Sequence, residues 1–368
     1  MSWTLQNLVV LSLLALGAWI VRSMRRREYW RLAGRELLAR RGAVVSGAIL
    51  AAYLVVALLD SVGWRNAERD PETGEVRRNP QTGEVIYDRG RSVLDRMLAP
   101  LAARQELYYS APLAAEAYIY EAQEGEGGAP RRVHPALRHP RAHLLGTDRI
   151  GNDVLLLSIK SIRTGIIIGL LTTLIAIPFA LLMGILAGYY GGWLDDIIQY
   201  IYTVVSSIPT VLFVAAFIVI FGVGLPQLCV AMGLASWTSL CRLLRAETLR
   251  LRESEFVAAA VALGTPSWRI LLRHILPNVL HVVIITTVLR FSSEVLAEAL
   301  LTYLGIGVGA QTMSWGVMIN DARSELTRDP VIWWKLAAAF VFMLGLVLPA
   351  NLFGDAVRDA LDPRLRTQ

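Results

Sequence analysis

The sequence predicts an all-α polytopic membrane protein, on three observations. Of its 368 residues, 55% are hydrophobic and the mean hydropathy is +0.48, which is too apolar for a soluble domain of this size. Uncharged apolar runs recur along the chain, near or above the roughly 20 residues that a spanning helix needs. Arginines gather mainly between these runs. We expect seven spans, at 5–21, 42–59, 164–194, two within 197–241 that break at 222–226, 278–300 and 336–353.

The first 41 residues are expected to hold one extra span and a basic linker. The run at 5–21 precedes its arginines, and no small-residue cleavage pattern follows it, which favours a retained helix over a cleaved signal peptide. Residues 22–41 hold eight arginines and should be cytoplasmic. Seven spans then place the N-terminus and residues 64–143 outside and the C-terminus inside. The net charge of +6 thus indicates anchoring at lipid headgroups and no nucleic-acid binding.

Residues 64–142 form a polar insert after the first core span. It begins with a duplicated motif, at 71–76 and 80–85, whose Pro-x-x-Gly turns and β-prone pairs predict strand-and-turn structure. The apolar spacing of 92–106 predicts a helix, and the Gly/Glu composition of 121–130 indicates a linker. Two roles stay open for the insert: contact with a substrate-delivery protein, or a stabilising cap.

A short polar signature, LGTDRIGNDV at 145–154, follows the insert. Gly146 and Gly151 suit turns. Asp148 and Asp153 suit the cap of a helix that enters the membrane, and Thr147 lies between the two turns.

The segment 242–277 is a basic island between apolar runs, and its six arginines place it in the cytoplasm. Ser254 suits an N-cap, and Glu255 suits the positive end of a helix dipole. The helix that follows is rich in alanine, which would let a partner approach closely, and Gly264 should end it. A second helix is expected over 267–276. The alternative is a solvated loop that only joins two spans.

Three charged residues interrupt the span at 278–300. Arg290, Glu294 and Glu298 recur at i, i+4 and i+8 and therefore share one helical face. Charges inside a bilayer are costly and usually face a bundle interior or a watery cavity. Two interpretations stay open: a polar stripe along a translocation path, with Glu298 as the favoured lumen residue, or a structural Arg290–Glu294 ion pair.

The sequence offers no catalytic motif. Its two lysines, Lys160 and Lys335, do not follow the glycines of a phosphate-binding loop, and no G-x-S-x-G is present. The histidines at 134, 139 and 143 stand among prolines and arginines, which favours a surface turn over a metal site. We expect no catalytic residue, no metal and no cofactor on this chain.

Five segments resemble, in order, the permeases of ABC importers for dipeptides, oligopeptides and nickel. They are the signature at 145–154, GYYGGWLD at 188–195, the stretch at 255–278, LTYLGIG with SWG over 301–316, and the C-terminal stretch at 351–364. In that family the third segment is the EAA loop, which docks into an ATPase. The likeness is closest to the second, or C-type, permease of a pair.

The resemblance implies a type I importer core of about six helices. It would comprise the first core span at 42–63 and residues 143–368, with 1–41 as an addition and 64–142 as an insert. By resemblance, the residues that couple to the ATPase are Glu255, Ala258, Ala259, Ala260, Gly264, Arg269, Arg273 and Pro277. Ala258 stands where the family often has the glutamate that gives the loop its name.

The resemblance also implies partners: a homologous permease, two ATPases that use ATP and Mg²⁺, and an extracytoplasmic solute-binding protein. The setting is the bacterial inner membrane, with peptides as the expected cargo and nickel or another small solute as the alternative. A passive channel or a membrane scaffold is the rival outside this family.

Overall fold

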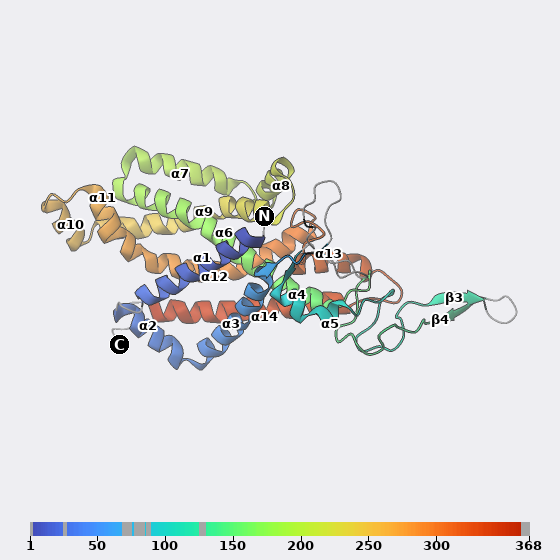
Figure 1. Ribbon diagram of the computed structural model, residues 1–368. Helices are drawn as coiled ribbons and strands as arrows, with labels where there is room; N and C mark the ends of the chain where they lie inside the picture. Colours follow the sequence, from blue (N-terminus) through green and yellow to red (C-terminus); the bar gives the residue numbers. More distant parts are fainter. Residues whose placement is uncertain are drawn as a thin grey trace. The chain divides into compact units, whose positions relative to one another are not determined.

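A computed structural model describes residues 3–24, 28–67, 76, 85, 90–124 and 130–361, and these are largely helical (Figure 1). The chain divides into two compact units, each built from separate stretches of sequence. Unit 1 takes 1–32, 51–163 and 322–342, and unit 2 takes 33–50, 164–321 and 343–368. The insert and the polar signature therefore belong to unit 1, whereas the EAA-like segment belongs to unit 2.

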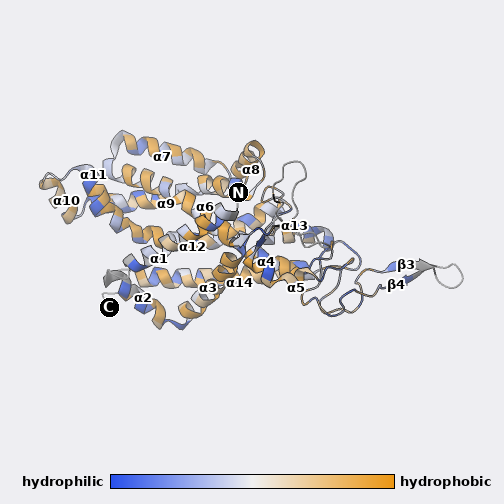
Figure 2. Ribbon diagram, viewed as in Figure 1, coloured by the Kyte–Doolittle hydropathy of each residue, from blue (hydrophilic) through white to orange (hydrophobic). Residues whose placement is uncertain are grey.

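Long apolar helices confirm the polytopic fold, and Figure 2 shows their mostly hydrophobic residues. Five helical runs in the described part are long and apolar enough to span a bilayer, and a bent pair, α7 (Gly192–Ser207) with α8 (Thr210–Phe221), makes a sixth. The five are α3 (Arg41–Ser61), α6 (Val154–Tyr190), α9 (Leu225–Arg252), the run Ser267–Tyr303 and α14 (Trp334–Leu361). Helix α1 (Trp3–Met24) covers the first expected span, and α2 (Glu28–Ala39) covers the basic linker.

One span has a break that the sequence interpretation missed. Helices α7 and α8 are bent by 86° across Ile208 and Pro209, where a continuous helix was expected. Ile208 is extended (φ −83°, ψ 123°), because a proline disfavours helical backbone in the residue before it. The other break is confirmed, since α8 ends at Phe221 and α9 begins at Leu225.

The insert in unit 1 contains short helices and two small two-stranded sheets. The helix expected over 92–106 is present only in part, as α4 (Val93–Met97) and α5 (Ala99–Ala102), and residues 103–106 are not helical. Ser92 with Asp95 forms a capping box at the start of α4. Strands β1 (Gly63–Trp64) and β2 (Arg91–Ser92) pair antiparallel. The prediction of a linker at 121–130 is wrong for both ends of this stretch, because β3 (Glu121–Glu124) pairs antiparallel with β4 (Pro130–Val133). The duplicated motif lies outside the described residues apart from Val76 and Val85.

Unit 2 has two apolar cores. The larger one draws buried residues from α6, α7, α9 and α12 (Leu276–Tyr303), among others, and includes Trp237, Leu244 and Val279. The second lies around Ile168, Leu228 and Met232. Their burial fixes the helices that carry the sites described next.

Candidate functional site

The EAA-like segment begins at Ser254. Its extended backbone (φ −73°, ψ 149°) puts Ser254 at the N-cap of α10 (Glu255–Ala262), as expected. The Ser254 hydroxyl donates to the Leu251 carbonyl (2.5 Å), however, and caps no N–H of the helix. Glu255 lies in the first turn, where the helix dipole favours a carboxylate.

Gly264 ends α10 in a Schellman motif. The Thr265 N–H donates to the Ala260 carbonyl (3.0 Å), and the Gly264 N–H donates to the Val261 carbonyl (2.9 Å). Gly264 has φ +74°, a left-handed backbone that disfavours any side chain. A Cβ at Gly264 would meet nothing within 4 Å, so conformation alone selects glycine here.

The segment buries one narrow face and exposes the rest. Val257 and Ala260 of α10 and Ile270 of α11 (Ser267–Ile270) belong to the larger apolar core. Ala258 and Ala259 are exposed, as the expected contact with a partner requires. Five large apolar residues are exposed as well, and we name them the exposed apolar face: Phe256, Val261, Leu263, Trp268 and Leu272.

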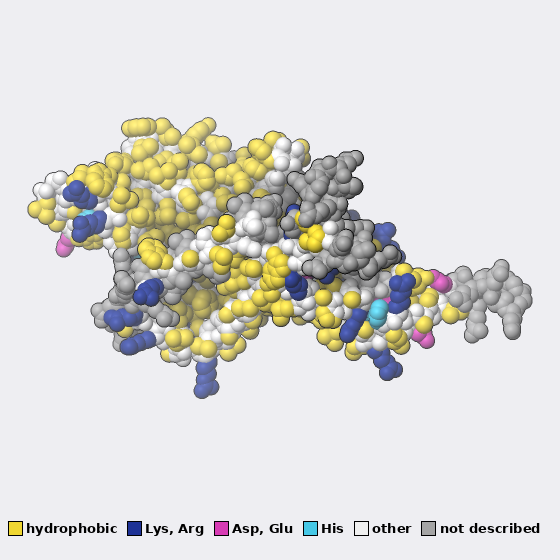
Figure 3. Space-filling view, in the orientation of Figure 1, with side chains coloured by type: hydrophobic (Ala, Val, Ile, Leu, Met, Phe, Trp, Pro, Cys, Tyr) yellow, Lys and Arg dark blue, Asp and Glu magenta, His cyan; other side chains and the backbone are white. Residues whose placement is uncertain are grey.

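Basic side chains border this apolar face. Arg269 lies over the Trp268 ring (5.2 Å to the centroid), and Arg269 and Arg273 are both exposed. The Phe256 and His274 rings are 6.3 Å apart. Figure 3 shows the basic side chains gathered over α10 and α11, next to hydrophobic surface. The surface would suit a partner with an apolar groove and acidic edges.

The second expected helix continues into the next span. After α11, residues Leu271–Ile275 form a π turn and α12 runs over Leu276–Tyr303, so Ser267–Tyr303 is one helical run. Pro277 lacks an N–H and would clash with the carbonyl four residues before it in a regular α-helix. The π turn ends two residues before Pro277 and includes Arg273, the residue whose carbonyl would clash, which relieves that conflict.

An ion pair that the sequence interpretation missed joins α7 to α9. Arg245 donates to both Asp195 oxygens, from Nε to Oδ1 at 2.5 Å and from Nη2 to Oδ2 at 2.6 Å. Gln199 also donates to Asp195 Oδ2 (3.1 Å). The pair fixes α9 shortly before it delivers the chain to Ser254. The available signal in the sequence was a pair of acids, Asp195 and Asp196, that separates two long apolar runs.

A cavity of about 490 Å³ lies between α7, α8, α9 and α12, all in unit 2. Its polar lining consists of Ser206, Thr210, Ser236, Thr238, Ser239, Arg242, Arg290, Ser293 and Glu294. Apolar side chains such as Val211, Met232 and Leu301 fill the remaining wall. The lining therefore offers many hydroxyl groups and a few charges to a solute.

In the structure, the charged stripe contains the expected ion pair, and two of its residues line the cavity, whereas the translocation path stays a prediction. Arg290 and Glu294 both line the cavity, and they also form an ion pair (Nη2–Oε1 3.4 Å). Arg290 further donates to Ser239 of α9 (3.0 Å), which links the two helices. Glu298 is not brought to the cavity. It is 2% exposed and accepts a hydrogen bond from Thr302 (2.9 Å).

The polar signature in unit 1 holds the insert in place. Thr147 Oγ1 accepts from the Ser110 N–H (2.7 Å) and donates to the Tyr108 carbonyl (3.1 Å). Trp334 at the start of α14 donates its indole N–H to the Thr147 carbonyl (2.9 Å). Asp148 accepts from the backbone N–H of Asn152 (2.8 Å) in a tight turn.

Two glycines of the signature allow close approach of the backbone. Gly146 and Gly151 have φ +73° and +78°. A Cβ at Gly151 would lie 1.8 Å from the Glu106 carbonyl oxygen, and one at Gly146 would lie 2.4 Å from that of Ser110. The glycines of the signature therefore let the insert pack closely against the start of α6.

A buried charged group completes this junction. Asp153 caps α6 through the Leu155 N–H (2.8 Å) and contacts His143 Nδ1 (3.0 Å), a histidine that is 1% exposed. Glu106 lies 3.6 Å from His143 Nε2. Burial raises the pKa of Glu106, but two backbone N–H donors, from Arg138 and His139, and the nearby His143 outweigh it and hold that pKa below its ordinary value.

Comparison with known proteins assigns a family to this architecture. Residues 180–367 match the family described as binding-protein-dependent transport system inner membrane component. A chain of the inward-facing methionine ABC transporter MetNI has a TM-score of 0.48 and 15% identity, over 57% of this chain and 98% of that one.

Several curated relatives are permease proteins. The dipeptide transport system permease protein DppC of Alkalihalophilus pseudofirmus is 35% identical over 63% of this chain and 75% of its own. The glutathione permease protein GsiD of Pectobacterium atrosepticum is 35% identical over 61% and 74%. The oligopeptide permease protein OppC of Bacillus subtilis is 33% identical over 61% and 72%. The chain belongs to the family of binding-protein-dependent transport system inner membrane components, as a multi-pass permease.

Proposed function

We propose that this chain is one of two permease subunits of an ATP-driven peptide importer. It would form half of a translocation path and couple to a separate ATPase through its EAA loop, residues 242–277. A homologous permease, two ATPases and an extracytoplasmic solute-binding protein would complete the machine. ATP and Mg²⁺ would bind to the ATPases alone.

The exposed apolar face carries this proposal. Exposed apolar residues that gather on one polar, cytoplasmic-type segment are typical of an interaction site. In α10, Val257 and Ala260 are buried while Phe256 and Val261 remain exposed, so the helix is fixed to the core and open to a partner. Arg269 and Arg273 at its border favour an acidic rim on that partner.

The names of the relatives support peptides as the cargo. Dipeptide, glutathione and oligopeptide permeases are among the proteins similar to this chain. The cavity lined by Arg290, Glu294 and several hydroxyls supports a polar solute. Its charges lie within a spanning helix, where they are retained only beside water or a partner charge.

The proposed orientation follows from the arginines. The EAA loop and the C-terminus would face the cytoplasm, and the N-terminus and residues 64–143 would face outward. Closure of the ATPases on ATP would displace α10 and turn the cavity from inward-facing to outward-facing. Peptide released by the solute-binding protein would then enter it.

Uptake of labelled dialanine by the reconstituted complex tests the proposal. The complex is placed in proteoliposomes with its partner permease, ATPases and solute-binding protein. We expect dialanine to accumulate only when ATP is present on the side of the membrane that carries the ATPases and the solute-binding protein is present on the opposite side. Equilibration of dialanine without ATP would indicate a passive channel and refute the proposal.

A further inference from the structure

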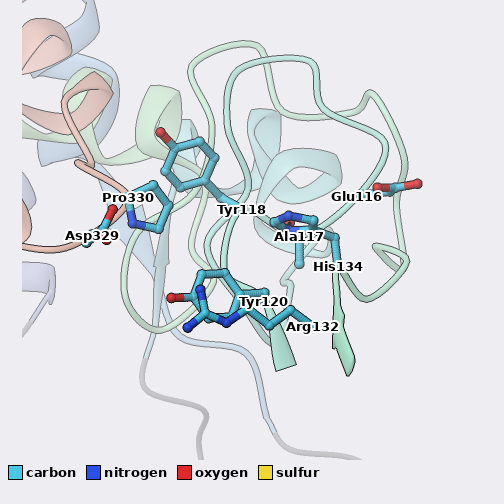
Figure 4. A pocket seen from close by; sticks show the side chains of 8 residues that line it. All are labelled: Glu116, Ala117, Tyr118, Tyr120, Arg132, His134, Asp329 and Pro330. Atoms are coloured by element: carbon cyan, nitrogen blue, oxygen red, sulfur yellow. Dashed lines mark hydrogen bonds between the residues drawn. The ribbon is translucent and has the colours of Figure 1, made fainter. Parts of the chain in front are cut away.

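A second cavity, of about 520 Å³, lies entirely within unit 1. It is lined by Tyr118, Tyr120, Arg132 and His134 of the insert and by Asp329 and Pro330 from the loop between α13 (Trp315–Glu325) and α14, together with Glu116 and Ala117 (Figure 4). The family match begins at residue 180, so most of this cavity belongs to the part of the chain that is additional to the matched core.

The aromatic walls of the cavity are held in fixed positions. The Tyr118 ring packs edge-on against Trp334 (4.8 Å between centroids), and its hydroxyl donates to the Val331 carbonyl (3.1 Å). Tyr120 meets His134 edge-on at 6.3 Å. His134 Nδ1 lies 3.0 Å from the Ala117 carbonyl, which can only accept, so that nitrogen carries the proton. The walls are therefore organised before any ligand arrives.

The cavity also presents one cation and one anion. The Arg132 guanidinium lies over the Tyr120 ring, with its central carbon 4.5 Å from the ring centroid, and Arg132 is exposed. Asp329 stands across the cavity beside Pro330, whereas the Glu116 carboxylate points away from the other labelled side chains (Figure 4). Within the described part of the chain, no ion pair includes Arg132 or Asp329.

We propose that this cavity binds a short zwitterionic peptide. Arg132 would receive the C-terminal carboxylate, Asp329 the N-terminal ammonium, and the Tyr118 and Tyr120 rings the apolar body. A tripeptide extended over roughly 10 Å fits the scale of the cavity, since extended chain spans about 3.3–3.6 Å per residue. The choice of a peptide as ligand rests on the proposed function. The insert would then hold cargo on the permease itself, apart from the translocation cavity.

Binding of trialanine to the purified full-length chain tests this site, by isothermal titration in lipid nanodiscs. Arg132 and Asp329 are both exposed, and an exposed charge pair is worth about 0.2–1 kcal/mol, so amidation of the C-terminus should weaken binding by up to about fivefold. In Arg132→Gln, free and amidated trialanine should bind equally. N-acetylation of trialanine should likewise weaken binding to the wild type, and in Asp329→Asn free and acetylated trialanine should bind equally. Arg138→Gln, an exposed arginine of the same insert outside the cavity, should keep the full penalty for amidation.

Three results would overturn the inference. One is absence of trialanine binding to the wild-type chain at millimolar concentration. Another is a penalty for amidation that Arg132→Gln leaves unchanged, which would place the peptide elsewhere. If Arg132→Gln instead weakens binding of the solute-binding protein, the surface is a protein contact and the proposal fails. ATP-driven uptake is a separate readout: a complex that imports dialanine although the chain binds no trialanine keeps the proposed function and loses only this site.

Discussion

Replacement of Gly264 is the sharpest perturbation that the EAA loop offers. Gly264 has φ +74° and open space around its missing Cβ, so Gly264→Ala adds conformational strain and no clash. A left-handed backbone costs an alanine about 1–2 kcal/mol, and a β-branched valine more. That strain acts on the turn that separates α10 from α11 and displaces the exposed apolar face.

Gly305 provides a matched control. It follows α12 with φ +81°, and a Cβ there would also meet nothing within 4 Å. The same pair of Schellman hydrogen bonds is present, from Ile306 N–H to Leu301 (2.9 Å) and from Gly305 N–H to Thr302 (3.0 Å). Gly305→Val and Gly264→Val should therefore lose similar amounts of folding free energy.

The assay is ATP hydrolysis by the reconstituted complex, with and without loaded solute-binding protein. We expect Gly264→Val to lower the stimulated rate about fivefold or more, since allosteric coupling free energies are typically 1–3 kcal/mol. Gly305→Val should keep the stimulation, and both variants should assemble with the ATPases. Equal loss in both variants would make the effect one of stability alone, and unchanged stimulation in Gly264→Val would refute the coupling role.

Three further predictions concern stability. Arg245→Met should destabilise unit 2 by about 3 kcal/mol in chemical denaturation, because it leaves the Asp195 carboxylate buried without its partner, whereas the exposed Arg250→Met should cost under about 0.5 kcal/mol. Folding lowers the pKa of Glu106, so its carboxylate contributes its full stabilisation above the ordinary pKa of 4.5, and this contribution is lost as the pH falls through the pKa of the folded state. Amide hydrogen exchange around Glu106 should therefore become faster at acid pH in the wild type and show no such pH dependence in Glu106→Gln. Gly151→Ala should lower the yield of folded chain in size-exclusion chromatography, because its Cβ would meet the Glu106 carbonyl oxygen, and a normal yield would refute the tight junction.

Much of the fold could be predicted because hydropathy and helix breakers act locally. The uncharged runs became helices, and the Gly222–Pro226 break was predicted from its composition. Pro209 was missed because it lies inside a long uncharged run with no glycine beside it. The β3–β4 hairpin was missed because its strands are rich in Glu and Arg, residues that seldom mark a strand.

The candidate site was predictable only where it is local in sequence. Gly264 and the N-cap at Ser254 follow from spacing along one helix. The contact of Arg290 with Ser239 joins residues 51 positions apart, which no periodicity along α12 reveals. Glu298 shares a helical face with Arg290, yet Thr302 and the neighbouring Gly316 cover it, so a shared face did not mean a shared cavity.

The uninterrupted helix from Ser267 to Tyr303 has a mechanical consequence. Ile270 and Arg290 are about 30 Å apart along the helix, at 1.5 Å per residue. Because the helix between them is continuous, a displacement of Trp268 would be passed on to Arg290. The π turn at Leu271–Ile275 sets the rotational phase between the two ends, since one residue more or less turns everything beyond it by about 100°. A one-residue deletion in that turn would leave the helix continuous but point Arg290 away from the cavity, so under the proposed coupling the length of this stretch would matter as much as its composition.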